Sequence, residues 1–188
     1  MPAAPVARRS GLAFTIVVSV VMFVGACVMA LVLLMSSAPG ALVVGVVLAA
    51  GPVAPLIACF VWLDRYEPEP RSLLLLGLGW GAFVASSSAL LLQIAGEFAF
   101  EAPRTFSGAV VAPLTEEAAK GLFILLLLWF RRHELDGILD GIVYAGMVGI
   151  GFAFTENILY LSAADLGSDG QSGGVGGAIM LFVIRGVF

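Results

Sequence analysis

A group of ionisable side chains stands at the head of one long apolar run. Glu116, Glu117 and Lys120 come directly before the apolar residues 121–130. A lysine or carboxylate at bilayer depth costs about 2.5–3.5 kcal/mol on insertion scales, so such residues mark functional sites more often than anchors. Two neighbouring carboxylates in a low-dielectric cavity do not both ionise readily, which makes one of them a usable general acid or base near neutral pH.

Lys120 follows Glu116 by one helical turn. A lysine at this spacing is placed to hold the carboxylate ionised, or to stabilise an oxyanion that develops during hydrolysis. Two plainer readings stay open. In the first, Lys120 is only an ion-pair partner. In the second, the two glutamates only stabilise a helix N-terminus electrostatically, and Thr115 caps that helix.

Glu156 and Asn157 form a second polar pair, inside the apolar residues 137–162. Successive spans alternate in direction, so this run ends on the side where the run at 110–130 begins. Glu156 then lies about 9 Å from that end at about 1.5 Å per residue, a depth similar to that of Glu116 and Glu117. The alternative role of Glu156 is a hydrogen bond to a neighbouring helix. We expect one site with five candidate catalytic residues: Glu116, Glu117, Lys120, Glu156 and Asn157.

Small residues recur at every fourth position along the same run. They are Gly137, Gly141, Ala145, Gly149 and Ala153, with Asn157 next in the series. A ridge of small side chains lets two helix backbones approach closely in lipid. We therefore expect this ridge to pack the helix against the bundle, with Asn157 pointing inward, where its amide can donate to a carbonyl oxygen.

The composition is that of a polytopic membrane protein. Of the 188 residues, 61% are hydrophobic and only 12% are charged, whereas soluble domains have about 25% charged residues. No basic patch indicates a nucleic-acid partner. Cys27 and Cys59 both lie within apolar runs, which favours small hydrophobic residues over a disulfide or a metal pair.

Hydropathy predicts an all-α fold, a single integral-membrane domain at 1–188 with about six spans. The predicted spans are residues 12–35, 41–63, 72–95, 110–130, 137–162 and 175–188, and a loop is expected at 96–108. Residues 175–188 rise only about 21 Å as a helix, short of the roughly 30 Å hydrocarbon core. We therefore expect the last span to be truncated and the chain to be a fragment.

The arginines predict an orientation in the cell membrane. With alternating spans and a cytoplasmic N-terminus, six arginines fall inside, and only Arg104 falls outside. The six are Arg8, Arg9, Arg65, Arg71, Arg131 and Arg132. This bias predicts a cytoplasmic N-terminus and places the acidic residues of both polar clusters near the outer surface.

Other ionisable residues fit the proposed site less well. Asp140 lies about 24 Å along a helix from Glu156, so one compact site does not hold both. Asp136 and Asp140 are interpreted as structural or interfacial residues. His133 lies beside two arginines at a boundary and is read as a solvated residue. Arg185 either neutralises the acidic cluster or extends its guanidinium to the interface.

Five segments together resemble the PrsW-type intramembrane proteases, which are distantly similar to the CAAX prenyl protease group. They are the Glu-Glu-x-x-Lys at 116–120, residues 136–144, residues 151–153, the pair 156–157, and the Glu-Pro-Glu-Pro loop within 62–70. The resemblance extends over about residues 62–185. It implies an endopeptidase that hydrolyses a membrane-protein or peptide substrate near the outer surface of the lipid bilayer, by a glutamate-activated water with or without a metal.

The resemblance also implies an arginine-bearing span with a histidine within it, after the arginine. Arg185 suits that span, but the histidine is not in this sequence, so we expect the catalytic set of these 188 residues to be incomplete. Zinc is the candidate metal, with Glu117 and Glu156 as candidate ligands, although the sequence has no His-Glu-x-x-His helix. The alternatives to a protease are a proton-coupled small transporter and a non-catalytic membrane scaffold.

Overall fold

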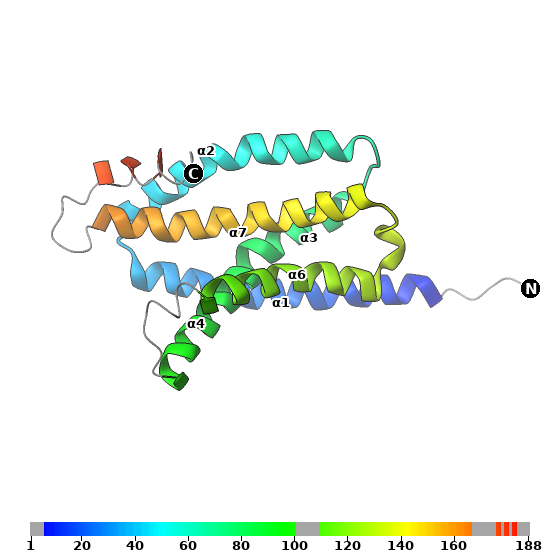
Figure 1. The fold of residues 1–188 in the computed structure, drawn as a ribbon, viewed down its shortest axis with the longest axis horizontal. Coiled ribbons are helices and arrows are strands. Elements are labelled where there is room, and N and C mark those ends of the chain that lie inside the picture. The colour runs from blue at the N-terminus through cyan, green and yellow to red at the C-terminus, as the bar shows by residue number, and fades with distance from the viewer. Residues whose placement is uncertain (1–5, 101–109, 167–175, 178, 181, 184–188) are drawn as a thin grey trace, which may run out of the picture.

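The computed structural model describes residues 6–100, 110–166, 176–177, 179–180 and 182–183. This part of the chain is helical and contains no strand, as the predicted all-α class requires. The elements, in chain order, are α1 (Val6–Ser36), α2 (Pro39–Asp64), α3 (Arg71–Gly79), the π-helix η1 (Trp80–Ala85), α4 (Ser86–Phe100), α6 (Ala112–Phe130), the 3-10 turn η3 (Arg132–Glu134) and α7 (Ile138–Leu166). Figure 1 shows α1, α2, α6 and α7 running roughly parallel or antiparallel.

Four helices of the described chain are long and apolar enough to cross a membrane. They are Leu12–Ser36, Pro39–Asp64, Arg71–Gly96 and Ile138–Ala163. These helices coincide with the first, second, third and fifth predicted spans. The third runs unbroken through α3, η1 and α4, and α4 continues to Phe100, so the first residues of the predicted loop at 96–108 are helical instead.

The count of six spans is not established. The fourth predicted span forms α6, a helix of 19 residues that carries Glu116, Glu117 and Lys120. Its three charges set it apart from the four apolar helices. The sixth predicted span, at 175–188, lies mostly outside the described residues, and so does the side chain of Arg185.

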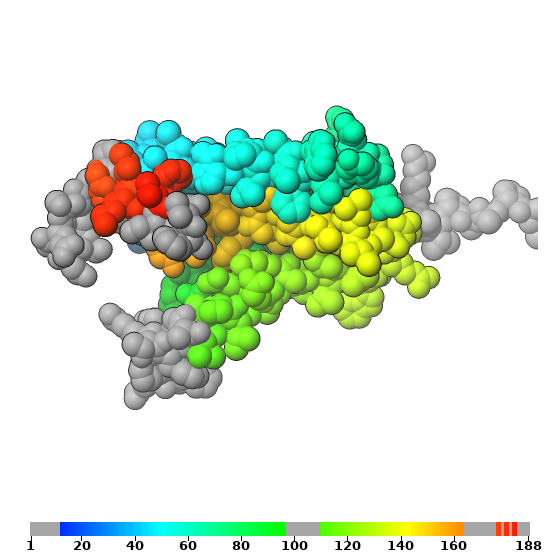
Figure 2. All heavy atoms as spheres, turned by 45° about the horizontal axis from the view of Figure 1, so that its top comes forward, coloured from blue at the N-terminus to red at the C-terminus, as the bar shows by residue number. Residues whose placement is uncertain are grey.

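Helix α7 lies at the centre of the bundle. It packs most extensively against α2 and next against η1 and α3, and Figure 2 shows α2 and α7 side by side along one face. Its closest crossing is at the junction of α3 and η1. A Cβ on Gly81 of η1 would collide with the Val148 carbonyl oxygen, and one on Gly151 with the carbonyl oxygen of Leu78 in α3. Only glycine allows two backbones to approach so closely.

This crossing differs from the predicted small-residue ridge. A Cβ on Gly141 or Gly149 would meet no described atom within 4 Å, and Ala145 is exposed. Three of the five ridge members therefore do not make the close packing that we predicted for the ridge among the described residues. The glycines that do so, Gly81 and Gly151, are not members of the ridge.

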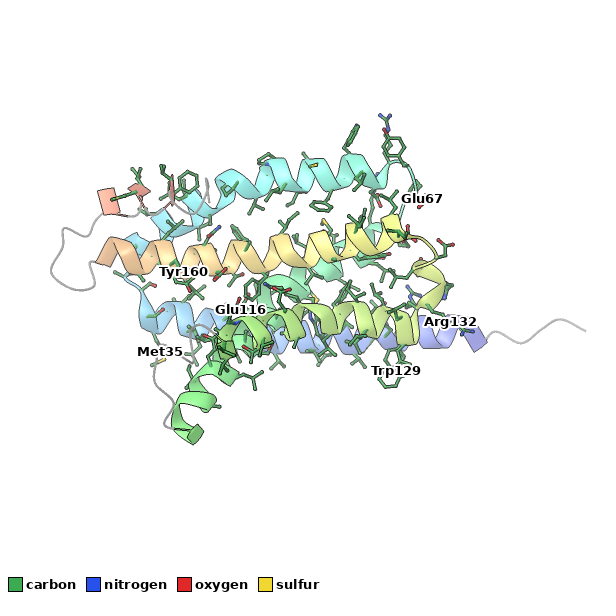
Figure 3. All side chains as sticks on the ribbon, in the orientation of Figure 1. Met35, Glu67, Glu116, Trp129, Arg132 and Tyr160 are labelled. Atoms are coloured by element: carbon green, nitrogen blue, oxygen red, sulfur yellow. The ribbon has the colours of Figure 1, made fainter. Side chains whose placement is uncertain are left out.

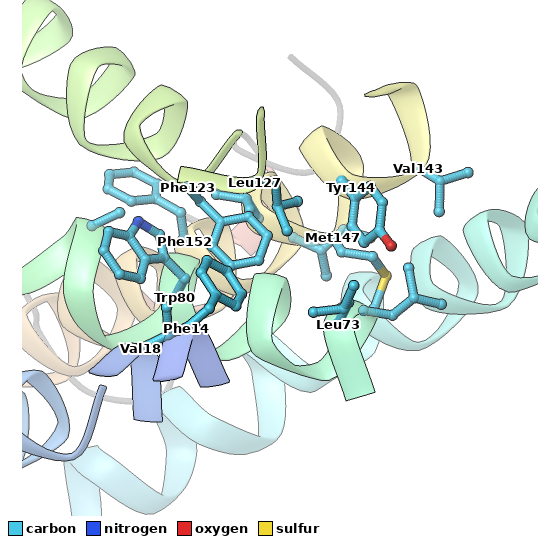
Figure 4. Packing of buried hydrophobic residues seen from close by; sticks show 14 of the residues in the cluster. Phe14, Val18, Leu73, Trp80, Phe123, Leu127, Val143, Tyr144, Met147 and Phe152 are labelled. Carbon is cyan, nitrogen blue, oxygen red and sulfur yellow. The ribbon is translucent and has the colours of Figure 1, made fainter. Parts of the chain in front are cut away.

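The core lies where α3, η1, α6 and α7 meet. It is built around fully or almost fully buried side chains such as Trp80, Phe123, Leu127, Tyr144 and Phe152, several of which Figure 4 shows in contact. The rings of Trp80 and Phe123 lie 5.8 Å apart in a tilted arrangement. This packing fixes α6 and α7 against η1, the element between them.

One end of the bundle combines many of the described charges with exposed aromatic rings. The α2–α3 loop and the α6–α7 connection meet there, and the start of α1 lies at the same end (Figure 1). Trp129 is 82% exposed and Tyr66 59% exposed, beside Arg65, Arg131 and Arg132 in the sequence. Such a belt of rings and arginines is typical of a membrane–water interface.

Candidate active site

A cavity of about 370 Å³ lies between α1, α4, α6 and α7. Both Glu116 and Glu156 line it, and we call it the Glu116–Glu156 cavity. Its other lining residues are Val32, Ser36, Ser37, Ser86, Ala89, Leu90, Gln93, Phe152, Leu159, Tyr160 and Ala163. In Figure 3 the labelled Glu116 and Tyr160 lie well away from the end that holds Glu67 and Arg132. The structure thus brings together acids from two separate helices.

Glu116 reaches the cavity from the first turns of α6. Pro113 stands at the start of this helix, where a missing N–H costs nothing. The Gln93 side-chain amide, from α4, donates to Glu116 Oε1 at 3.4 Å. Glu117 and Lys120 follow Glu116 within about one turn of α6, and Glu156 lines the same cavity from α7. Glu116 is therefore the acid of α6 that faces the cavity.

Glu117 points elsewhere. Its side chain is 74% exposed, and its carboxylate pairs with Lys120 Nζ at 2.7 Å; it is not among the residues that line the cavity. We predicted the Lys120 contact for Glu116, but the structure gives it to Glu117. The Lys120 ammonium also lies 3.9 Å from the centre of the Phe152 ring, and that ring forms part of the cavity wall.

Glu156 and Asn157 face different sides of α7. Asn157 lines a second cavity of about 240 Å³ with Pro52, Val53 and Leu56 of α2, whereas Glu156 lines the first. Consecutive residues on a helix point about 100° apart, and here that rotation turns Asn157 toward α2 while Glu156 faces α6. The structure does not bring Asn157 to the carboxylates with which we grouped it.

Five polar residues of the cavity were not predicted, and Ser36 and Ser37 are two of them. Gln93, Ser86 and Tyr160 all line it, and Ser86 uses its hydroxyl to donate to the Gly81 carbonyl at 2.9 Å. A glutamine within the apolar third span was the available signal, because polar residues at bilayer depth rarely face lipid. Thr115, suggested as a helix cap, instead donates to the Val111 and Ala112 carbonyls at 2.9 Å.

A second acidic cluster lies at the opposite end of α7. We call it the acidic hollow. It encloses about 510 Å³ and its acids are Glu67, Glu69, Glu134, Asp136 and Asp140, with His133 on its rim. His133 Nε2 lies 3.4 Å from Glu134, and the imidazole is 64% exposed, as expected for a solvated histidine.

Hydrogen bonds occupy two acids of the hollow, Asp140 and Glu69. Asp140 is 2% exposed, and its Oδ2 accepts the backbone N–H groups of Asp136 and Gly137 at 3.1 and 2.8 Å. Tyr144 donates its hydroxyl to Glu69 Oε2 at 2.6 Å. Burial raises the pKa of Glu69, and the negative charge of Asp140 raises it further, while the Tyr144 hydrogen bond opposes both. Asp140 has the structural role that the sequence indicated.

The described residues do not complete a metal site. Catalytic zinc usually takes three protein ligands, and no group of three His, Cys, Asp or Glu in the described chain could hold an ion. The Glu116–Glu156 cavity contributes two carboxylates. The predicted ligand Glu117 faces away from it. We therefore derive no chemical step through a metal.

Comparison with known proteins identifies a family. Residues 69–188 match the family described as "PrsW family intramembrane metalloprotease". This range includes η1, α4, α6 and α7, and with them both acids of the Glu116–Glu156 cavity. No solved structure matches the chain.

Several curated relatives carry the name "Protease PrsW". One from Geobacillus kaustophilus (strain HTA426) is 32% identical over 112 residues, which are 60% of this chain and 49% of the relative. One from Clostridioides difficile (strain 630) is 32% identical over 115 residues, covering 58% and 48%. One from Bacillus subtilis (strain 168) is 29% identical over 110 residues, covering 58% and 50%. The chain spans about half the length of these relatives, and it belongs to the PrsW family of intramembrane metalloproteases.

Proposed function

We propose that this chain forms part of a membrane-embedded endopeptidase whose acid–base pair is Glu116 and Glu156. The observation that carries the proposal is their meeting in one cavity from two different helices. The relatives named "Protease PrsW" support proteolysis as the reaction.

Glu116 is the general base of the proposed reaction. It takes a proton from a water molecule while the water oxygen bonds to the scissile carbonyl carbon. The Gln93 amide, which donates to Glu116, favours the ionised carboxylate that a base requires.

Glu156 is the proton donor. It protonates the amine nitrogen as the carbon–nitrogen bond breaks. The proton on Glu116 then passes through solvent to Glu156, which restores the starting state of the pair. Like charges in one small cavity favour a single shared proton, which gives the two acids their different roles. The apolar wall formed by Phe152, Leu90 and Leu159 keeps bulk water from weakening these charges.

The proposed topology has a cytoplasmic N-terminus, as the arginine distribution predicts. The structure describes the side chains of four arginines: Arg65, Arg71, Arg131 and Arg132. All four belong to segments at the end of the bundle that carries the exposed rings of Trp129 and Tyr66. The positive-inside rule makes this end cytoplasmic. The cavity then lies toward the outer surface, α6 is a further crossing, and the substrate is a membrane protein or peptide cut near that surface.

The test uses the full-length parent protein in proteoliposomes with a tagged membrane-protein substrate. Glu156→Gln keeps the size of the side chain and removes its proton transfer, so cleavage should fall by about 10²–10⁴-fold. Glu134→Gln, at the other end of the molecule, is the matched control and should cleave normally. Cleavage by Glu156→Gln at the wild-type rate would exclude the assigned role.

A further inference from the structure

We propose that the π-helix η1 sets the separation of Glu116 and Glu156, and that Trp80 and Thr155 are the positioning residues that carry it. This inference rests on the proposed function, because it explains how two acids on different helices are held in working geometry. Neither residue touches the Glu116–Glu156 cavity. Each acts through the backbone of a helix.

Trp80 fixes the α6 side. Its ring is 3% exposed, and its indole N–H donates to the Ala119 carbonyl at 3.0 Å. Ala119 lies one turn beyond Glu116 and directly before Lys120. A buried indole N–H without a partner is costly, so this bond ties α6 to η1 at the level of its charged residues.

Thr155 fixes the α7 side. It is 3% exposed, and its hydroxyl donates to the Ala82 carbonyl at 2.7 Å. Thr155 directly precedes Glu156. The bond therefore connects η1 to α7 at the residue next to Glu156. These two helices are far apart in the sequence.

The wide turn of η1 explains why these contacts form there. A π turn departs from the regular α-helical hydrogen-bond ladder, and such turns occur often at functional sites. Here two consecutive carbonyls of the turn accept side-chain hydroxyls: Gly81 from Ser86 and Ala82 from Thr155. The second of these reaches α7, so the irregular turn is used as a connection.

The glycine crossing adds a rigid point next to these bonds. Gly81 of η1 lies against the Val148 backbone, and Gly151 of α7 lies against the Leu78 backbone. Helix α7 packs more extensively on η1 than on α6. The relative placement of α6 and α7 at the cavity thus depends on the element between them.

Removing either bond should lower turnover more than substrate binding. In the full-length parent, Thr155→Val keeps the side-chain shape and removes the hydroxyl, and Trp80→Phe keeps a ring and removes the N–H. We expect the kcat of each to fall by about tenfold or more with KM unchanged, since small misplacements of catalytic groups are costly. Thr155→Ser should restore kcat because it returns the hydroxyl.

Ser87→Ala is the matched control. Ser87 is also buried, but its hydroxyl bonds the Phe83 and Val84 carbonyls of η1 within the same continuous helix. These bonds connect η1 to neither α6 nor α7, so their loss should leave kcat unchanged. If Thr155→Val does not fold, Trp80→Phe and Thr155→Ser decide the question. Folded Thr155→Val and Trp80→Phe proteins with wild-type kcat would overturn the inference.

A geometric readout separates this inference from the proposed function. A Glu116→Cys, Glu156→Cys pair, with Cys27 and Cys59 replaced by alanine, is cross-linked by a short bifunctional thiol reagent. Adding Thr155→Val or Trp80→Phe should slow cross-linking at least several-fold, whereas Ser87→Ala should not. Unchanged cross-linking refutes the positioning role, whereas slowed cross-linking with full activity of Glu156→Gln refutes only the proposed chemistry.

Discussion

The two acidic clusters of this molecule differ in what occupies their carboxylate oxygens. In the acidic hollow, Asp140 accepts two backbone N–H groups and Glu69 accepts the Tyr144 hydroxyl. In the Glu116–Glu156 cavity, the acids come from different helices and face a common space, and Glu116 has a long contact of 3.4 Å with Gln93. The first arrangement closes a loop around the start of a helix, and the second leaves room for a substrate.

This difference teaches how acids near a membrane can be sorted. A carboxylate whose oxygens satisfy buried backbone donors stabilises the fold, and its loss leaves those donors unpaired. A carboxylate aimed at a cavity with a second acid nearby contributes to chemistry and often weakens the fold slightly. Each prediction below tests one side of this contrast.

The largest effect should come from the cavity pair acting as a unit. Glu116→Gln and Glu156→Gln should each lower kcat by about 10²–10⁴-fold, and the double variant should lose little more than the worse single variant, because residues acting together are not additive. Single-turnover cleavage by the three variants measures this. If the loss of kcat in the double variant equals the product of the two single losses, the two acids act independently.

The second-largest effect should come from the close helix crossing at Gly81 and Gly151, which lies between the two acidic clusters. Gly151→Ala places a methyl group against the Leu78 carbonyl, a backbone atom that cannot move aside. Overpacking of this kind costs about 1–3 kcal/mol and should reduce both thermal stability and kcat. Gly149→Ala, which meets no described atom within 4 Å, is the control, and equal losses in the two variants would contradict the assigned crossing.

In the acidic hollow we expect a substitution to lower stability and to leave kcat unchanged. Asp140→Ala should destabilise the protein by about 1.5–3 kcal/mol, because two part-buried backbone N–H groups lose a charged acceptor. In the protein that remains folded, kcat should stay near the wild-type value. Detergent-solubilised thermal unfolding and cleavage assays test the two halves, and a stable but inactive Asp140→Ala would move the chemistry to this end.

The smallest effect is a pH dependence from Glu69. Burial raises its pKa above the ordinary value of 4.5, so folding favours the protonated carboxyl. The resulting stabilisation is complete below about pH 4.5 and is lost as the pH rises through the folded-state pKa. Glu69→Gln should flatten this slope in thermal unfolding measured from pH 4 to pH 8, by no more than about 3 °C. A wild-type stability that rises with pH over this range and loses the rise in Glu69→Gln would contradict the sign.

Hydropathy was sufficient to predict much of this fold. Four predicted spans match four apolar helices, and the expectation that acids of two separate runs lie at one depth identified Glu116 and Glu156. Rotation about each helix was harder to predict. Glu117 and Asn157 are neighbours of the cavity acids in sequence, yet they point away from the cavity.

The packing geometry could not be predicted from periodicity. Gly141 and Gly149 belong to a regular ridge, but the close crossing uses Gly81 and Gly151, because tertiary packing selects which small residues meet a partner. The π turn at Trp80–Ala85 has no signature in the local residue types. Its effect on Trp80 and Thr155 is visible only in three dimensions.

The most direct test of the account compares two adjacent glutamates in the full-length parent. The central claim is that the cavity-facing acid of α6 performs the chemistry. The account predicts that Glu116→Gln lowers kcat by about 10²-fold or more while Glu117→Gln stays within about threefold of the wild type. A larger loss in Glu117→Gln than in Glu116→Gln would contradict it.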